Sequence, residues 1–180
     1  ADGQAYPIVR SKGKVITKFK QFAQMERVLG SYGGQIASFE WAFSPRGADG
    51  RPVPMFDRAT GAVDPDVVAY WRKHYDIAHR IRTQWPQLKA DLDGKVHVFV
   101  GTADTFYLDG AAHRLKAAFD AVGGKAEFHF LPDRTHFDLY AKGTDRRWLL
   151  SHIAWAMYQQ ARPDAVVPAG QQTRATSETP

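Results

Sequence analysis

The stretches K-V-H-V-F-V-G-T-A-D at 95–104 and K-A-E-F-H-F-L-P-D-R-T-H-F at 125–137 decide the fold of this chain. Their short β-rich runs, at 96–100 and 126–131, predict two strands, and the first has the composition of a strand buried on both faces. Residues 108–122 place apolar side chains on one helical face, and Gly123-Gly124 ends this helix. A strand–helix–strand order predicts two parallel strands joined by a right-handed crossover.

Each predicted strand ends in a loop with a chemically useful side chain. Asp104 follows the first strand and His136 follows the second. Sites of α/β proteins lie at the carboxyl ends of parallel strands, where an aspartate can orient a histidine that acts as a general base. We therefore take Asp104 and His136 as candidate catalytic residues. Alternatively, Asp104 only braces a turn, His136 is an ordinary loop residue, or Asp133 or Asp138 holds the imidazole.

In a hydrolase triad, an acid and a histidine act together with a nucleophile. No recognisable nucleophile motif is present in this sequence. No G-x-S-x-G string occurs. The most similar string, G-S-Y-G-G at 30–34 with Ser31, lacks its spacing and a preceding strand.

The chain has no cysteine. No phosphate-binding glycine loop and no H-E-x-x-H motif is present, and His97 and His129 fall within predicted strands. We expect neither a metal site nor a cofactor.

The N-terminal half is predicted to be helical and irregular. We expect a short strand near Val15–Ile16, a helix from Lys18 to Leu29, and a strand or buried connection at 36–43. Residues 44–63 predict an ordered excursion without regular structure. Asp64-Pro65 starts a helix to about His74, and segments 75–82 and 85–92 predict further helices.

The C-terminal end is predicted to be one long helix and a tail. The helix should run from Arg146 to about Ala161, and residues 163–180 read as a polar tail. The helix's expected packing stripe is Trp148, Leu149, His152, Ile153, Ala156 and Met157.

Composition excludes several classes of protein. The formal net charge of +5 comes from scattered lysines and arginines, which does not favour a nucleic-acid partner. No apolar run is long enough to span a membrane, so we expect a soluble protein without a membrane partner. Position 1 is not Met, so we expect a trimmed chain. A periplasmic or secreted location after processing is consistent with the sequence, which does not determine the cellular compartment.

The same residues resemble a known family. G-K-V-H-V-F-V-G-T-A-D-T-F-Y-L, F-H-F-L-P-D-R-T-H-F and the final helix resemble the C-terminal part of the α/β-hydrolase fold. More narrowly, they resemble bacterial esterases of the enterochelin-esterase-like or esterase-D-like group. M-E-R-V-L-G, Y-D-I-A-H and the segment P-M-F-D-R-A-T-G-A-V-D-P-D-V-V-A-Y-W also look like that group. The resemblance covers residues 18–160 and implies Asp104 as the acid and His136 as the base.

The expected fold class is therefore α/β, a partial hydrolase-like parallel sheet. Residues 1–162 would form one domain or half-domain, with 18–92 as a connecting region and 93–162 as the end of the sheet. The expected function is the C-terminal portion of a serine esterase-like hydrolase that cleaves a small ester or related acyl substrate. Its partner would be an N-terminal hydrolase segment or a second copy of the chain. The alternative is a non-catalytic binding or assembly module.

Overall fold

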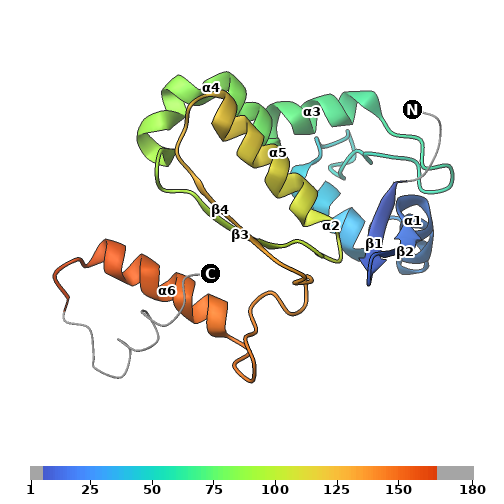
Figure 1. Cartoon of the computed structure of the whole chain (residues 1–180). Helices are drawn as coiled ribbons and strands as arrows, with labels where there is room; N and C mark the ends of the chain where they lie inside the picture. The colour runs from blue at the N-terminus through green and yellow to red at the C-terminus, as the bar shows by residue number, and fades with distance from the viewer. Residues whose placement is uncertain (1–5, 166–180) are drawn as a thin grey trace.

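A computed structural model describes residues 6–165 as a mixed α/β fold (Figure 1). The predicted tail is largely outside these residues. The elements in chain order are β1 (Pro7–Ser11), β2 (Lys14–Lys18), α1 (Phe19–Glu26), a 3-10 turn (Arg27–Leu29), α2 (Gly34–Phe43), α3 (Pro65–Tyr75), α4 (Ile77–Leu92), β3 (His97–Gly101), α5 (Leu108–Ala121), β4 (Glu127–Leu131) and α6 (Trp148–Ala161).

The predicted strand–helix–strand unit is confirmed. β3 and β4 pair in parallel, with His97 opposite Glu127 and Gly101 opposite Leu131, and α5 connects them. β1 and β2 form a separate antiparallel hairpin, of which the sequence indicated only the second strand. In a parallel pair the carboxyl ends of both strands lie at one edge, so the loops after Gly101 and Leu131 are neighbours.

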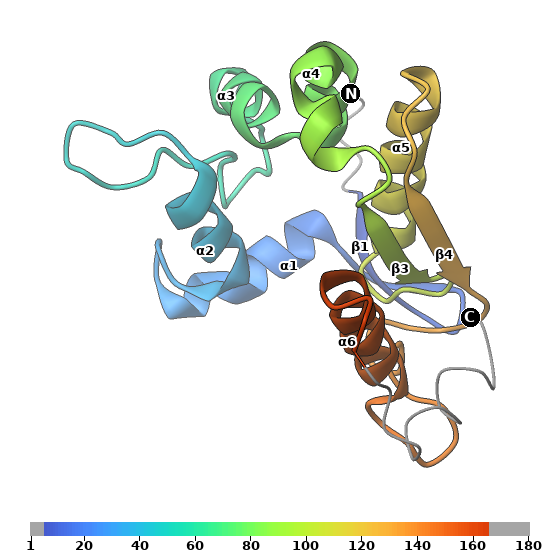
Figure 2. The same cartoon turned by 90° about the vertical axis from the view of Figure 1, so that its left-hand side faces the viewer.

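One face of the β3–β4 sheet is covered by helices. Ile81 and Trp85 of α4 and Ala118 and Phe119 of α5 form a buried cluster against this face. The rings of Trp85 and Phe119 meet edge to face at 5.6 Å between centroids. Figure 2 shows α5 along one side of the two strands and α4 at their upper end.

The opposite face of the sheet is partly exposed, which corrects the expectation of a strand buried on both faces. His97 begins β3 as an exposed residue, and only Val100 and Gly101 of this strand are buried. The β-rich composition of 96–100 reflects burial against α4 and α5 on one side. Alternate residues point away from these helices.

Residues 36–43 form a helix, so the expectation of a strand or buried connection there was wrong. Ile36, Ala37 and Glu40 are its buried residues, which is helical spacing. The helix start is held by Glu26, whose carboxylate accepts hydrogen bonds from the Gln35 and Ile36 N–H groups at 2.6 and 2.9 Å. This capping group is eight residues before the helix, so no local start signal marks it.

The excursion at 44–63 is ordered, as predicted. Phe56 is 3% exposed and contacts Phe19 edge to face. The buried carboxylate of Glu40 accepts hydrogen bonds from the Met55 N–H and from the Arg58 guanidinium. These contacts fix the excursion against α1 and α2.

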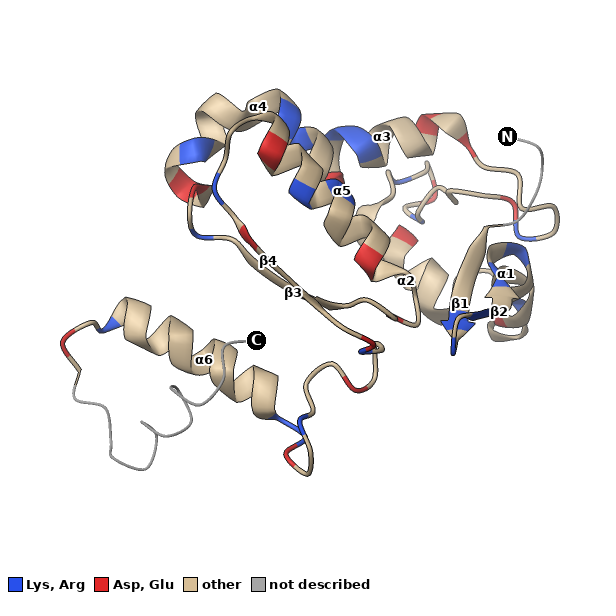
Figure 3. Cartoon of the chain, viewed as in Figure 1, with Lys and Arg blue, Asp and Glu red and all other residues tan. Residues whose placement is uncertain are grey.

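The remaining helices follow the sequence signals with two differences. The Asp64 side chain caps α3, as predicted. Of the predicted segments 75–82 and 85–92, Tyr75 ends α3, and the residues from Ile77 onward lie in the single helix α4, which has a kink at Gln84. In α6 the predicted packing stripe is confirmed only in its first part: Leu149 is buried and Trp148, His152 and Ile153 are half-buried, whereas Ala156 and Met157 are exposed. Figure 3 shows that α6 carries no charged side chain along its length.

Candidate active site at the carboxyl ends of β3 and β4

Asp104 is buried in the loop between β3 and α5, with 2% of its surface exposed. Its Oδ1 atom accepts hydrogen bonds from the N–H groups of Phe106 and Leu108 at 2.8 and 3.2 Å. This oxygen braces the turn that begins α5. The second oxygen, Oδ2, is left for another partner. One carboxylate can therefore both stabilise the loop and take part in the candidate site.

His136 is that partner. Its Nδ1 lies 3.1 Å from Asp104 Oδ2. The His136 side chain is 41% exposed, whereas the aspartate is buried. An ionised carboxylate only accepts hydrogen bonds, so this contact favours the tautomer with the proton on Nδ1, in which Nε2 is the acceptor nitrogen. The arrangement gives one buried acid, one oriented imidazole and one accessible basic nitrogen.

Gly101 lets the two loops approach this closely. A Cβ atom at this position would lie 2.0 Å from the Arg134 carbonyl oxygen. The same carbonyl accepts a hydrogen bond from the Ala103 N–H at 3.0 Å, and the Thr102 hydroxyl accepts one from the Asp133 N–H at 2.9 Å. The His136 loop therefore lies directly over the end of β3.

Arg10 of β1 holds the Asp104 loop from the other side. Its backbone N–H donates to the Thr105 carbonyl at 2.9 Å, and its Nε donates to the Asp104 carbonyl at 2.7 Å. The guanidinium also forms an ion pair with Asp109 at 2.8 Å and lies over the Tyr107 ring. Arg10 is thus a positioning residue for Asp104, and its sequence context, I-V-R-S, gives no signal of this role.

Two phenylalanines flank the imidazole. The rings of Phe106 and Phe137 meet His136 edge to face, with centroids 4.9 and 5.6 Å away. Phe137 is 78% exposed. These rings restrict the rotation of the imidazole and put an apolar surface beside it.

The alternative aspartates do not hold His136. Asp138 Oδ1 accepts hydrogen bonds from both the N–H and the hydroxyl of Thr135, at 2.6 and 2.8 Å. Burial alone would raise the pKa of Asp138, but these two hydrogen bonds and the charge of Arg134 outweigh it, so the pKa lies below its ordinary value. Asp133 occupies a left-handed turn position with φ of 57°. Both residues shape the loop that presents His136.

The part of the chain that the structure describes places no hydroxyl partner on this pair. Among residues 6–165, no serine or threonine hydroxyl is hydrogen-bonded to His136. Ser31 lines a hollow together with Arg27, Tyr32 and Phe56, and neither Asp104 nor His136 borders that hollow. The structure thus brings Asp104 and His136 together, whereas Ser31, whose sequence context is most similar to G-x-S-x-G, lies in a different part of the fold.

Comparison with known proteins gives no match to any family model, curated protein or solved structure. No helix among residues 6–165 has the length and apolar character needed to cross a bilayer.

Proposed function

We propose that this chain supplies the acid and base of a serine esterase-like hydrolase, as the C-terminal portion of a partial α/β-hydrolase-like fold. The observation that carries the proposal is the 3.1 Å contact between Asp104 Oδ2 and His136 Nδ1 at the carboxyl ends of parallel strands. The order of acid before histidine agrees with that fold. The nucleophile comes from a segment outside this sequence.

In the proposed reaction, the oxygen of a serine hydroxyl attacks an ester carbonyl carbon while His136 Nε2 takes the hydroxyl proton. The ring then donates that proton to the leaving alkoxide, which leaves an acyl-serine. Water completes the hydrolysis: His136 takes its proton as it attacks the acyl carbonyl and returns that proton to the departing serine oxygen. Asp104 stays ionised, keeps the ring in its Nδ1–H tautomer and stabilises the imidazolium. The exposed Phe137 ring beside the base suits a small apolar acyl group.

The tautomer of His136 provides a test that needs no nucleophile. Long-range ¹H–¹⁵N spectra of the purified chain should show neutral His136 with its proton on Nδ1. Asp104→Asn should change this pattern, because an amide can donate to Nδ1 and so favour the opposite tautomer. Asp133→Asn is the matched control, since it makes the same substitution in the His136 loop without touching the ring. A wild-type ring protonated on Nε2 would refute the assignment of the pair.

Activity tests the hydrolase proposal itself. If the gene encodes a G-x-S-x-G segment upstream, the longer protein should hydrolyse p-nitrophenyl esters. Asp104→Asn should then lower kcat by about 10⁴-fold and His136→Ala by about 10⁶-fold. Asp133→Asn should leave the rate unchanged. Equal rates for His136→Ala and the wild type would remove His136 from the mechanism.

The alternative is an assembly module without catalysis. It is favoured by one observation: α6 is uncharged and largely exposed, with Leu150 at 52% and Met157 at 68% exposure. Exposed apolar surface of this kind is typical of association sites. An inactive full-length protein whose His136 still shows the Nδ1–H tautomer would favour this reading, because the pair would then be structural.

A further inference from the structure

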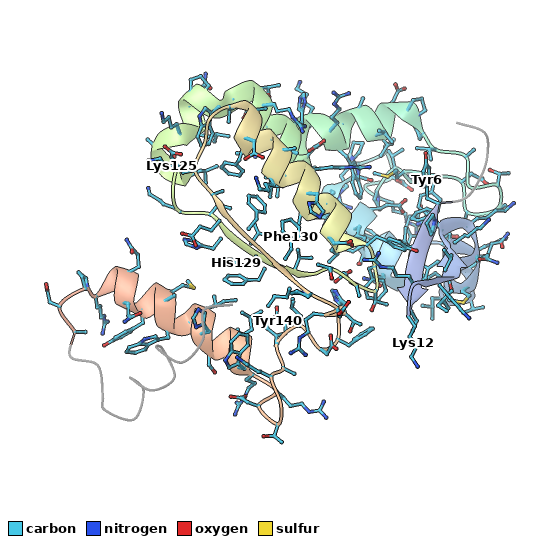
Figure 4. The ribbon with its side chains drawn as sticks, viewed as in Figure 1. Tyr6, Lys12, Lys125, His129, Phe130 and Tyr140 are labelled. Atoms are coloured by element: carbon cyan, nitrogen blue, oxygen red, sulfur yellow. The ribbon has the colours of Figure 1, made fainter. Side chains whose placement is uncertain are left out.

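Three potential metal ligands converge on the face of the sheet that α4 and α5 leave partly exposed. His97 begins β3, and Glu127, its register partner, begins β4. His129 lies two residues further along β4, on the same face as Glu127 because strand side chains alternate. Figure 4 shows His129 on the side of β4 away from α5 and Phe130 on the side toward it. Phe130 stacks on His113 of α5, at 4.0 Å between ring centroids.

The spacing of the three ligand atoms suits a small cation. His97 Nδ1 lies 3.0 Å and His129 Nε2 lies 3.5 Å from the same Glu127 oxygen, Oε2. All three atoms lie within 4.8 Å of one another. Tetrahedral zinc with bonds of about 2.0–2.1 Å holds its donor atoms about 3.3 Å apart. The two distances to Glu127 bracket that value, and the two imidazole nitrogens lie within 4.8 Å of each other.

The chemistry of the donors selects the class of cation. Two imidazoles favour a divalent transition metal such as zinc over Mg²⁺ or Ca²⁺, which prefer oxygen ligands. Stacking on the Phe99 ring, at 4.4 Å with the planes 7° apart, restricts the His129 ring. His129 is therefore partly pre-organised, whereas His97 and Glu127 are more exposed and can adjust.

We propose that His97, Glu127 and His129 form a binding site for a divalent transition metal, with zinc as the best match. The three ligands leave at least one coordination position open to water or an exogenous ligand. The ion ties the start of β3 to the start of β4, the end of the sheet opposite the Asp104–His136 pair. The site is independent of the hydrolase proposal, since it shares no residue with that pair.

Isothermal titration of the untagged chain with Zn²⁺ alone tests this proposal. The wild type should bind one equivalent, and His97→Ala, Glu127→Gln and His129→Ala should each weaken binding by more than about tenfold, because even the loss of a supporting group costs about 10–100-fold. His74→Ala is the control: this ring also has an aromatic neighbour at 4.4 Å between centroids, Tyr70, with the planes tilted by 39°, but it lies outside the cluster. His129→Cys should retain binding, because a thiolate is also a zinc ligand.

Two further measurements separate a metal site from an ion pair between Glu127 and protonated histidines. Co²⁺ should give the visible absorption of a low-coordinate nitrogen–oxygen site, and Zn²⁺ should raise the Tm of the wild type and of His74→Ala but not of His97→Ala. Circular dichroism verifies that each variant is folded. Equal zinc affinity of the wild type and the three ligand variants would overturn the proposal, as would a wild type that binds no zinc.

Discussion

Replacing Gly101 by alanine should disrupt the approach of the His136 loop to β3. The new methyl group would lie 2.0 Å from the Arg134 carbonyl oxygen, and 2.9 Å from Arg134 Cβ. Ordinary van der Waals contact begins near 3.4 Å, so the loop must move away by roughly 1.4 Å. The Ala103–Arg134 hydrogen bond and the Asp104–His136 contact both cross this gap. We expect the variant to be less stable by about 1–3 kcal/mol, the usual cost of overpacking.

Urea unfolding and imidazole NMR measure the two effects separately. Gly101→Ala should lower the free energy of unfolding and shift the ¹⁵N resonances of His136. Gly110→Ala is the control, because a Cβ there meets no atom within 4 Å. In the first turn of α5 this substitution should be neutral or stabilise by about 0.5–1 kcal/mol. Wild-type stability and an unchanged His136 spectrum in Gly101→Ala would refute the close-approach reasoning.

Two further predictions concern buried charge and acidity. Arg58→Met should destabilise the protein by about 3 kcal/mol in urea unfolding, because it leaves the buried Glu40 carboxylate without its charged partner. Adding Glu40→Gln should recover part of that loss, and an additive double variant would contradict this explanation. Thr135→Val should raise the pKa of Asp138 in a ¹³C carboxyl titration, because the hydroxyl donor is lost. A carboxyl group whose pKa is lower in the folded than in the unfolded protein stabilises the fold above the unfolded pKa, and this contribution is lost on acidification. The wild type should therefore lose more stability than Thr135→Val below about pH 4. Equal losses in the two proteins would contradict this explanation.

The parts of the fold and site that could be predicted are those with local signals. The β-rich runs, the amphipathic α5 and the double-glycine stop lie within one stretch, so their order alone implied that Asp104 and His136 would meet. The parallel register also brought His97, Glu127 and His129 together, although no metal site was expected. Sequence motifs for metals describe ligands on one helix or loop, whereas these ligands come from two strands.

The features that could not be predicted depend on contacts between distant segments. Residues 36–43 are helical because the Glu26 carboxylate caps them from outside, and no residue at 31–33 reports it. The exposed end of the α6 stripe, at Ala156 and Met157, likewise shows that a regular apolar pattern does not guarantee a neighbour that buries all of it. Gly101 was unremarkable in sequence, since its role depends on where Arg134 crosses β3.

The contact between Arg10 and Asp104 also bears on how the protein folds. The two residues are 94 positions apart, so their hydrogen bond closes a long loop that the chain must order against its own entropy. The β3–α5–β4 unit, by contrast, is built from contacts within about 35 residues and can form early. We therefore expect the acid to be fixed in place late in folding. Loosening of the β1 hairpin would then expose the Asp104 loop to hydrogen exchange while the sheet behind it stays protected.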